Sequence, residues 1–137
     1  MEKIYALFDF DGTLIGGDSI LLFMRYARRH KLCTVLDLAR FLLAGILYSL
    51  RWISPKRAKE MGLRFLNGKE RAVYVAAAED FCRTELLPRM YPKGLETLKR
   101  HQEAGHETLL VSASPAFYLQ PLKQLLGNGK GGLKVVA

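Results

Sequence analysis

A short apolar segment that ends in two carboxylates constrains this chain most. Residues 3–10 are rich in Ile, Tyr, Leu and Phe without polar alternation, the composition of a central parallel strand covered on both faces. Asp9-Phe10-Asp11-Gly12-Thr13 then supplies turn chemistry, and Gly12 can take a positive φ. The segment predicts a buried strand that breaks into a tight loop where Asp9 and Asp11 emerge together.

Four helices without an intervening strand are predicted after this loop. Such a run is typical of a small helical bundle inserted into another fold. The helices are expected from Asp18 or Ser19 to the basic cluster 28–31, over residues 35–50, from the N-cap Ser54 with Pro55 to about Gly68, and over residues 70–87 before Pro88.

The remaining residues return to an alternating pattern of helices and strands. A helix over 93–104 stopped by Gly105, a buried strand over 106–111 and a helix over 115–126 are predicted, with Ser114 as the N-cap of the last. Residues 127–132 are a Gly-rich linker without P-loop spacing, expected to be flexible, and residues 133–137 form one short strand.

The fold class expected from this order of elements is α/β. A Rossmann-like parallel sheet core is assigned to residues 1–15 and 89–137, and an all-helical cap, inserted after the first strand, to residues 16–88. With 137 residues, the chain has the size of one domain that carries an insertion.

Lys and Arg that solvate helix faces explain most of the positive charge of this chain, but the charge balance also suits partners rich in phosphate. The chain has 21 Lys and Arg against 13 Asp and Glu, a net charge of +8, which suits nucleic acid, anionic lipid or phosphorylated metabolites. Cys33 and Cys82 lack the spacing of a zinc site and are expected to be reduced and buried, and the three histidines are scattered and expected to be structural. The N-terminus has no secretory apolar region, because Asp9 and Asp11 interrupt it, which favours a cytoplasmic location.

The D-x-D-G-T pattern is specific, since four fixed residues match by chance on the order of 10⁻³ times in such a chain. The segment from Phe8 to Leu14 resembles the first motif of the haloacid dehalogenase superfamily of phosphohydrolases. The helical insertion resembles the cap of the phosphoserine-phosphatase-like branch, and Val111-Ser112-Ala113-Ser114-Pro115 is similar to that branch's second motif.

This resemblance implies a Mg²⁺-dependent phosphomonoester hydrolase with an aspartyl-phosphate intermediate. Asp9 would be the nucleophile and Asp11 the general acid and base. The Asp9 carboxylate and the Asp11 backbone carbonyl would hold Mg²⁺. Ser112 Oγ, with the backbone N–H groups of Gly12 and Ala113, would bind the phosphoryl oxygens.

The chain departs from the family pattern after its second motif. The resemblance implies a third-motif Lys and a fourth-motif acidic pair, but the 25 residues after Ser112 contain no Asp or Glu, and Lys130 and Lys134 come too early to substitute. We therefore expect a C-terminally truncated or frame-shifted chain with weak Mg²⁺ binding, because Mg²⁺ needs more than one protein anion.

Several alternatives remain open from the sequence. The substrate is expected to be a small phosphorylated metabolite or, as the alternative, a lipid phosphate. The uncharged run 41–50, flanked by Arg51-Trp52, is either buried in the cap or makes a peripheral membrane contact through residues 41–52. The rival to an enzyme is an inactive fragment that binds phosphate or a membrane surface. No specific nucleic-acid binding is expected, because no such module is recognisable.

Overall fold

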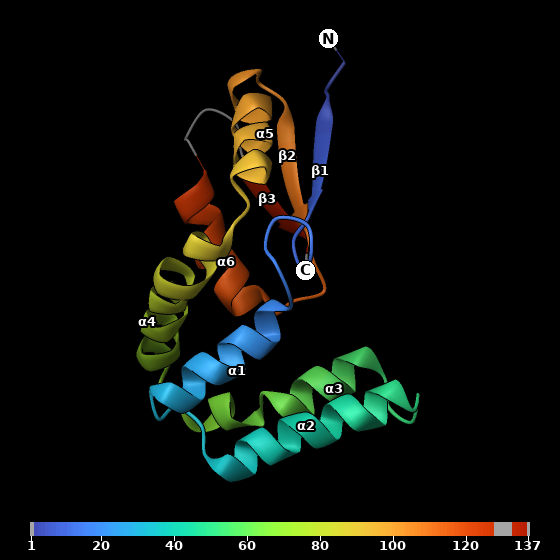
Figure 1. Cartoon of the computed structure of the whole chain (residues 1–137), viewed down its shortest axis with the longest axis vertical. Helices are drawn as coiled ribbons and strands as arrows, with labels where there is room; N and C mark the ends of the chain where they lie inside the picture. The colour runs from blue at the N-terminus through green and yellow to red at the C-terminus, as the bar shows by residue number, and fades with distance from the viewer. Residues whose placement is uncertain (1, 128–132, 137) are drawn as a thin grey trace. The chain divides into compact units, whose positions relative to one another are not determined.

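A computed structural model describes residues 2–127 and 133–136. The linker predicted over 127–132 lies outside the described residues apart from Gly127. Figure 1 shows the elements along the chain. The strands are β1 (Tyr5–Asp9), β2 (Glu107–Val111) and β3 (Leu133–Val136); the helices are α1 (Ser19–Arg29), α2 (Val35–Ser49), α3 (Pro55–Gly62), the 3-10 helix η1 (Arg64–Gly68), α4 (Arg71–Phe81), the π-helix η2 (Cys82–Leu86), the 3-10 helix η3 (Leu87–Arg89), α5 (Pro92–Glu103) and α6 (Ala116–Leu126).

The predicted α/β class is confirmed, because the three strands form one parallel sheet in the order β1-β2-β3. The register pairs Asp9 with Val111 and Val111 with Val136, so the carboxyl ends of all three strands lie at one edge. Loops at this edge of a parallel sheet are where ligands bind in open α/β folds. The sheet therefore brings the loop after Asp9 beside the loop after Val111.

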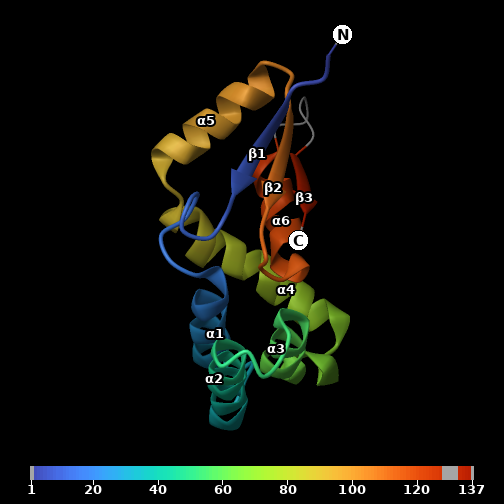
Figure 2. The ribbon, with the colours of Figure 1, turned by 90° about the vertical axis from the view of Figure 1, so that its right-hand side faces the viewer.

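One face of the sheet carries the core of this part of the chain. Ala6, Thr108, Leu110 and Leu133 are buried on it, and α5 and α6 lie along it (Figures 1 and 2). Both helices cover the same face because each belongs to a right-handed crossover that advances the sheet in one direction.

The prediction that residues 3–10 form a central strand covered on both faces is wrong for the described sheet. β1 is its edge strand, and on the face opposite α5 and α6 the side chains of Tyr5, Leu7, Val111 and Val136 are exposed, with Leu7 69% accessible. An apolar run shows only that a strand lacks polar residues. The order of the strands and the placement of the helices decide which faces of that strand are covered.

Local signals predicted the helices well. Thr34 and Asp37 form a reciprocal capping box at the start of α2, and the Ser54 hydroxyl accepts the Arg57 N–H at the start of α3. The helix predicted over 70–87 instead ends in η2 and η3, where the Leu87 N–H bonds to the Cys82 carbonyl. Pro88 lacks an N–H, so the last turns cannot continue an ordinary helix.

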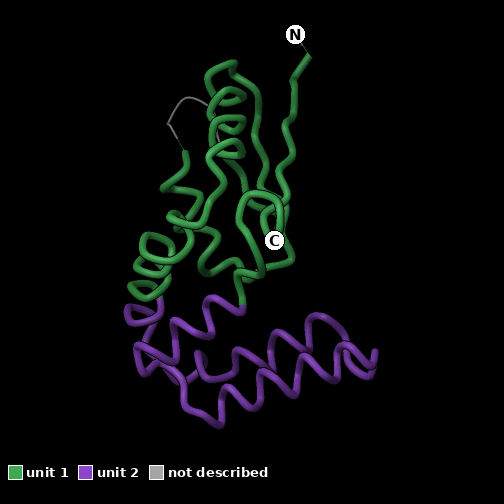
Figure 3. The backbone as a smooth tube through the Cα atoms, in the orientation of Figure 1, with its two compact units in different colours: residues 1–20, 75–137 green, residues 21–74 purple. Residues whose placement is uncertain are grey.

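The chain divides into two compact units, coloured separately in Figure 3. Unit 1 comprises residues 1–20 and 75–137, and unit 2 comprises residues 21–74. The sequence predicts boundaries after residue 15 and after residue 88. The observed boundaries fall after residues 20 and 74, so α1 and α4 each contribute to both units. The assignment of a catalytic core and a cap to these parts of the chain remains a prediction.

Gly105 should be needed for its backbone conformation, because it ends α5 at a φ of +78°. We expect Gly105→Ala to lower the free energy of unfolding by about 1 kcal/mol, since a Cβ disfavours the left-handed region. Gly45→Ala in α2 is the matched control: a Cβ there meets no atom within 4 Å. It should raise stability by about 0.5–1 kcal/mol in urea unfolding. Equal effects of the two substitutions would contradict this account.

Candidate active site

The loop after β1 turns tightly and separates the two predicted catalytic carboxylates. The N–H groups of Thr13, Leu14 and Ile15 all bond to the Phe10 carbonyl, at 3.2, 3.0 and 3.3 Å. Gly12 takes a φ of +75°, as its place in the turn predicted. Phe10 is fully buried and anchors the loop, so Asp9 and Asp11 take different surroundings on either side of it.

Asp9 is exposed at the carboxyl end of β1, and one of its oxygens is held in place. The Thr13 hydroxyl donates to Asp9 Oδ2 at 2.9 Å. The described residues give Asp9 Oδ1 no hydrogen bond, so this oxygen is available to a ligand. The role of Thr13 as a positioning residue was not assigned from the sequence, although its fixed place in the D-x-D-G-T motif was the signal for it.

Asp11 accepts hydrogen bonds from three donors in two segments of unit 1. The Ser19 N–H, at the start of α1, donates to Oδ1 at 2.7 Å. Oδ2 accepts the hydroxyl of Ser112 at 3.3 Å and, by a short contact, that of Ser114. Hydrogen bonds to a charged acceptor are stronger than neutral ones, so this carboxylate fixes the loop after β2 against the loop after β1.

A directed chain of hydroxyl groups leads to Asp11. Each hydroxyl has one proton, and that of Ser114 goes to Asp11, so the 2.9 Å contact between Ser19 and Ser114 uses the Ser19 proton. The 2.6 Å contact between Tyr118 and Ser19 then uses the Tyr118 proton. Burial raises the pKa of Tyr118, which keeps its hydroxyl protonated and a donor.

The same region corrects one expectation about Ser114. It was predicted to cap the helix over 115–126, but the N-cap of α6 is Pro115, and no side chain caps it. The Ser114 N–H instead bonds to Ser112 Oγ at 3.0 Å, and its hydroxyl faces Asp11. Spacing in the sequence favours a cap, but the half-buried carboxylate of Asp11, distant in the sequence, is the stronger acceptor.

Cys82 contacts the backbone of Tyr118, the residue at which the hydroxyl chain begins. Its thiol donates to the Tyr118 carbonyl at 3.0 Å, and burial raises its pKa to about 12. A thiol with so high a pKa is a poor nucleophile. Cys33 is also buried and free, so the expectation of two reduced buried thiols is confirmed.

The predicted metal ligands fit Mg²⁺ only in part. Carboxylate oxygen is the ligand that Mg²⁺ prefers, and Asp9 offers it at the strand end. Both oxygens of the Asp11 side chain are occupied by Ser donors. Among residues 2–127 and 133–136, no three His, Cys, Asp or Glu side chains gather at one point. These residues therefore supply one available anion, and no step below depends on a metal.

Comparison with known proteins agrees with this geometry. The model of the haloacid dehalogenase-like hydrolase family matches residues 6–135. The chain belongs to this family. The match includes the strand end with Asp9 and Asp11 and the loop with Ser112, so the resemblance seen in the sequence is confirmed at the level of the family.

Two curated relatives of Mycobacterium tuberculosis are similar over 96% of the chain, each 26% identical. One is described as a hydrolase (strain CDC 1551 / Oshkosh) and the other as phosphoserine phosphatase SerB1 (strain ATCC 25618 / H37Rv). The chain spans 44% of the length of each.

Two solved structures share the fold. A protein of unknown function from Bordetella pertussis Tohama I has a TM-score of 0.81 and 23% identity, over 97% of this chain and 60% of that one. A phosphoserine phosphohydrolase-like protein from Francisella tularensis subsp. tularensis SCHU S4 has a TM-score of 0.60 and 18% identity, over 98% of this chain and 58% of that one.

The different surroundings of the two carboxylates predict different effects on stability. Asp11→Asn removes a charged acceptor shared by three donors, and we expect it to lower the free energy of unfolding by about 1.5–3 kcal/mol. Asp9→Asn, the matched control, should change it by less than about 0.5 kcal/mol, because Asp9 is exposed. Chemical denaturation of both variants measures the difference; an equal loss would contradict the assigned net.

Proposed function

We propose that this chain carries part of a phosphomonoesterase site: the nucleophile, the general acid and base, and the groups that bind the phosphoryl oxygens. The observation that supports this most is the contrast between Asp9, exposed and held through one oxygen, and Asp11, enclosed by serine donors. An exposed and oriented carboxylate suits attack on phosphorus, whereas an enclosed one suits proton transfer.

In the proposed reaction, Asp9 Oδ1 attacks the phosphorus of a small phosphorylated metabolite. The bond from phosphorus to the leaving oxygen breaks, and Asp11, which must be protonated when the substrate is bound, gives that oxygen its proton. Water then attacks the aspartyl phosphate, gives its proton back to Asp11, and releases phosphate and free Asp9. Ser112 Oγ, once its proton turns from Asp11 to the substrate, and the N–H groups of Gly12 and Ala113 would bind the phosphoryl oxygens, as members of two loops at the same sheet edge.

Mg²⁺, when bound by Asp9 and the backbone carbonyl of Asp11, would offset the repulsion between the nucleophile and the phosphate. With one available protein anion, its affinity for the site should be low. The third-motif Lys and fourth-motif acids that the family resemblance implies are not assigned to any described residue.

Hydrolysis of para-nitrophenyl phosphate with millimolar Mg²⁺ tests this proposal. We expect slow turnover by the chain, no turnover above background for Asp9→Asn, and a loss of about 10²–10⁴-fold for Asp11→Asn. Lys99→Gln, on the exposed surface of α5, is the control that should keep full activity.

The inactive-fragment alternative makes a different prediction for the same samples. If the wild-type chain shows no turnover, or turnover that Asp9→Asn leaves unchanged, the enzymatic proposal fails for this chain. Saturable binding of inorganic phosphate that is lost in Ser112→Ala, without turnover, would then identify a phosphate-binding fragment.

A second candidate function, contact with an anionic membrane surface, is supported by unit 2. The alternative that residues 41–50 are buried in a helical bundle is wrong for most of them: Ala44 is buried, but an apolar stripe along α2 is exposed. Its members, spaced one or two helical turns apart, are Leu36, Leu43, Ile46 and Leu50, and Trp52 beyond the helix is 74% accessible.

The charge of unit 2 favours the same partner. Residues 21–74 contain twelve Lys and Arg against three Asp and Glu, a net charge of +9, which exceeds that of the whole chain. Basic residues beside an exposed apolar stripe with Trp are typical of interfacial helices. None of the described helices has the length and apolar character needed to cross a bilayer. We therefore propose surface contact, with a lipid phosphate as the alternative substrate class.

Vesicle flotation tests the membrane proposal. The double substitution Leu43→Glu and Ile46→Glu should lower partitioning onto vesicles rich in phosphatidylserine by at least about tenfold, because burying each side chain contributes about 1.5–3 kcal/mol. Val73→Glu, an exposed position on α4 of the same unit, is the matched control and should change partitioning little. Equal partitioning of wild type and the double variant would reject membrane contact.

A further inference from the structure

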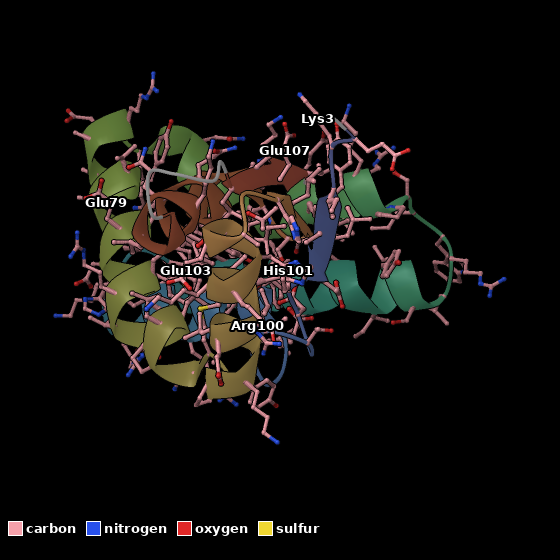
Figure 4. The ribbon with its side chains drawn as sticks, turned by 90° about the horizontal axis from the view of Figure 1, so that it is seen from above. Lys3, Glu79, Arg100, His101, Glu103 and Glu107 are labelled. Atoms are coloured by element: carbon pink, nitrogen blue, oxygen red, sulfur yellow. The ribbon has the colours of Figure 1, made fainter. Side chains whose placement is uncertain are left out.

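Two histidines contact each other at the end of the sheet opposite Asp9. His101 lies in the last turn of α5, and His106 directly precedes β2. Their Nδ1 atoms are 2.9 Å apart, and both side chains are half-buried. Figure 4 views this end of the sheet and labels His101. The expectation that the histidines are scattered is thus wrong for this pair, while His30, exposed beside Tyr26, belongs to unit 2.

The end of α5 fixes the pair through the backbone. The His106 N–H bonds to the His101 carbonyl at 3.0 Å, and the Gly105 N–H bonds to the Gln102 carbonyl at 3.1 Å. These two bonds, with a positive φ at Gly105, define a Schellman motif. The motif brings together the side chains at the positions of His101 and His106, where an apolar contact is usual. Here it brings together two imidazoles.

The surroundings hold the first ring in place. The ring of Phe8, on β1, meets that of His101 edge to face at 5.9 Å between centroids. The two imidazole centroids are 5.1 Å apart at an interplanar angle of 45°. The nearest ion pairs at this end, Lys3 and Lys134 with Glu107, satisfy the charge of Glu107 without either histidine. The Nδ1 atoms therefore face each other and not a carboxylate.

We propose that His101 and His106 form a two-histidine chelate for a divalent transition metal ion such as Zn²⁺. Without metal, one Nδ1 must donate a proton and the other accept it. Zn²⁺ binds imidazole nitrogen at about 2.0–2.1 Å, so two of its ligands lie about 3.3 Å apart; the rings need to separate by a few tenths of an ångström and to turn so that both Nδ1 lone pairs point at the ion. Imidazole favours Zn²⁺, Ni²⁺ and Cu²⁺ over Mg²⁺, which separates this site from Asp9 in chemistry as well as position.

Water or an exogenous ligand would fill the other coordination positions, because no third His, Cys, Asp or Glu of the described residues joins the pair. Structural zinc sites have four protein ligands, whereas other zinc sites keep coordination positions for water or substrate. A shell with two protein ligands resembles the second kind. The proposal does not depend on phosphatase activity, since it concerns binding alone at the amino-terminal edge of the sheet.

Calorimetric titration of the untagged chain with Zn²⁺ tests the chelate. We expect one site, weakened at least about tenfold by His101→Leu or His106→Phe, because even the loss of an outer partner of a ligand costs 10–100-fold in affinity. His106→Phe restores the usual apolar contact of the motif, so the variant should stay folded by circular dichroism. His30→Gln is the matched control and should bind as wild type does.

Two further measurements make the outcome unambiguous. Cu²⁺ should bind more tightly than Zn²⁺, and its electron paramagnetic resonance spectrum should show coupling to imidazole nitrogen that both variants lose. Zn²⁺ should raise the melting temperature of the wild type and of His30→Gln, but not of the two variants. Absence of Zn²⁺ binding at millimolar concentration, or binding that survives in both variants, would overturn the proposal.

Discussion

The carboxylate of Asp11 is the interaction on which the site in unit 1 depends. It joins the loop after β1, the start of α1 and the loop after β2, segments that are up to 103 residues apart in the sequence. Each donor to it is a serine, and the hydroxyl chain behind them ends at the buried ring of Tyr118. This single acceptor joins the loops at the two strand ends and so gives the proposed phosphoryl site its shape.

The parallel sheet explains why this acceptor and Asp9, the proposed nucleophile, lie at the same edge. Pairing of Asp9 with Val111 places the residues after each strand at the same edge, whatever intervenes between them in the sequence. The whole of unit 2 lies between β1 and β2 in the chain without altering that register. The candidate site residues are therefore placed by the edge of the sheet, and the inserted helices do not change that placement.

The two units differ strongly in surface chemistry. The excess positive charge and the exposed apolar stripe of α2 belong to unit 2, whereas the hydroxyl net and the two carboxylates belong to unit 1. A strongly basic unit attracts anionic surfaces or substrates at long range, and an enclosed acid does chemistry at short range. This division is consistent with a unit that selects an anionic partner and a unit that carries the reacting groups.

The sequence by itself determined the features that depend on neighbours a few residues apart. The cap at Ser54, the stop at Gly105 and the turn that follows Asp9 are set by local hydrogen bonds and by φ, so residue type and spacing predicted them. Tertiary structure alone decided that β1 is an edge strand, that Ser114 turns to Asp11 and that Tyr118 reaches Ser19. These contacts join residues 99 and 103 positions apart or depend on strand order, and no local pattern records which distant group a side chain will meet.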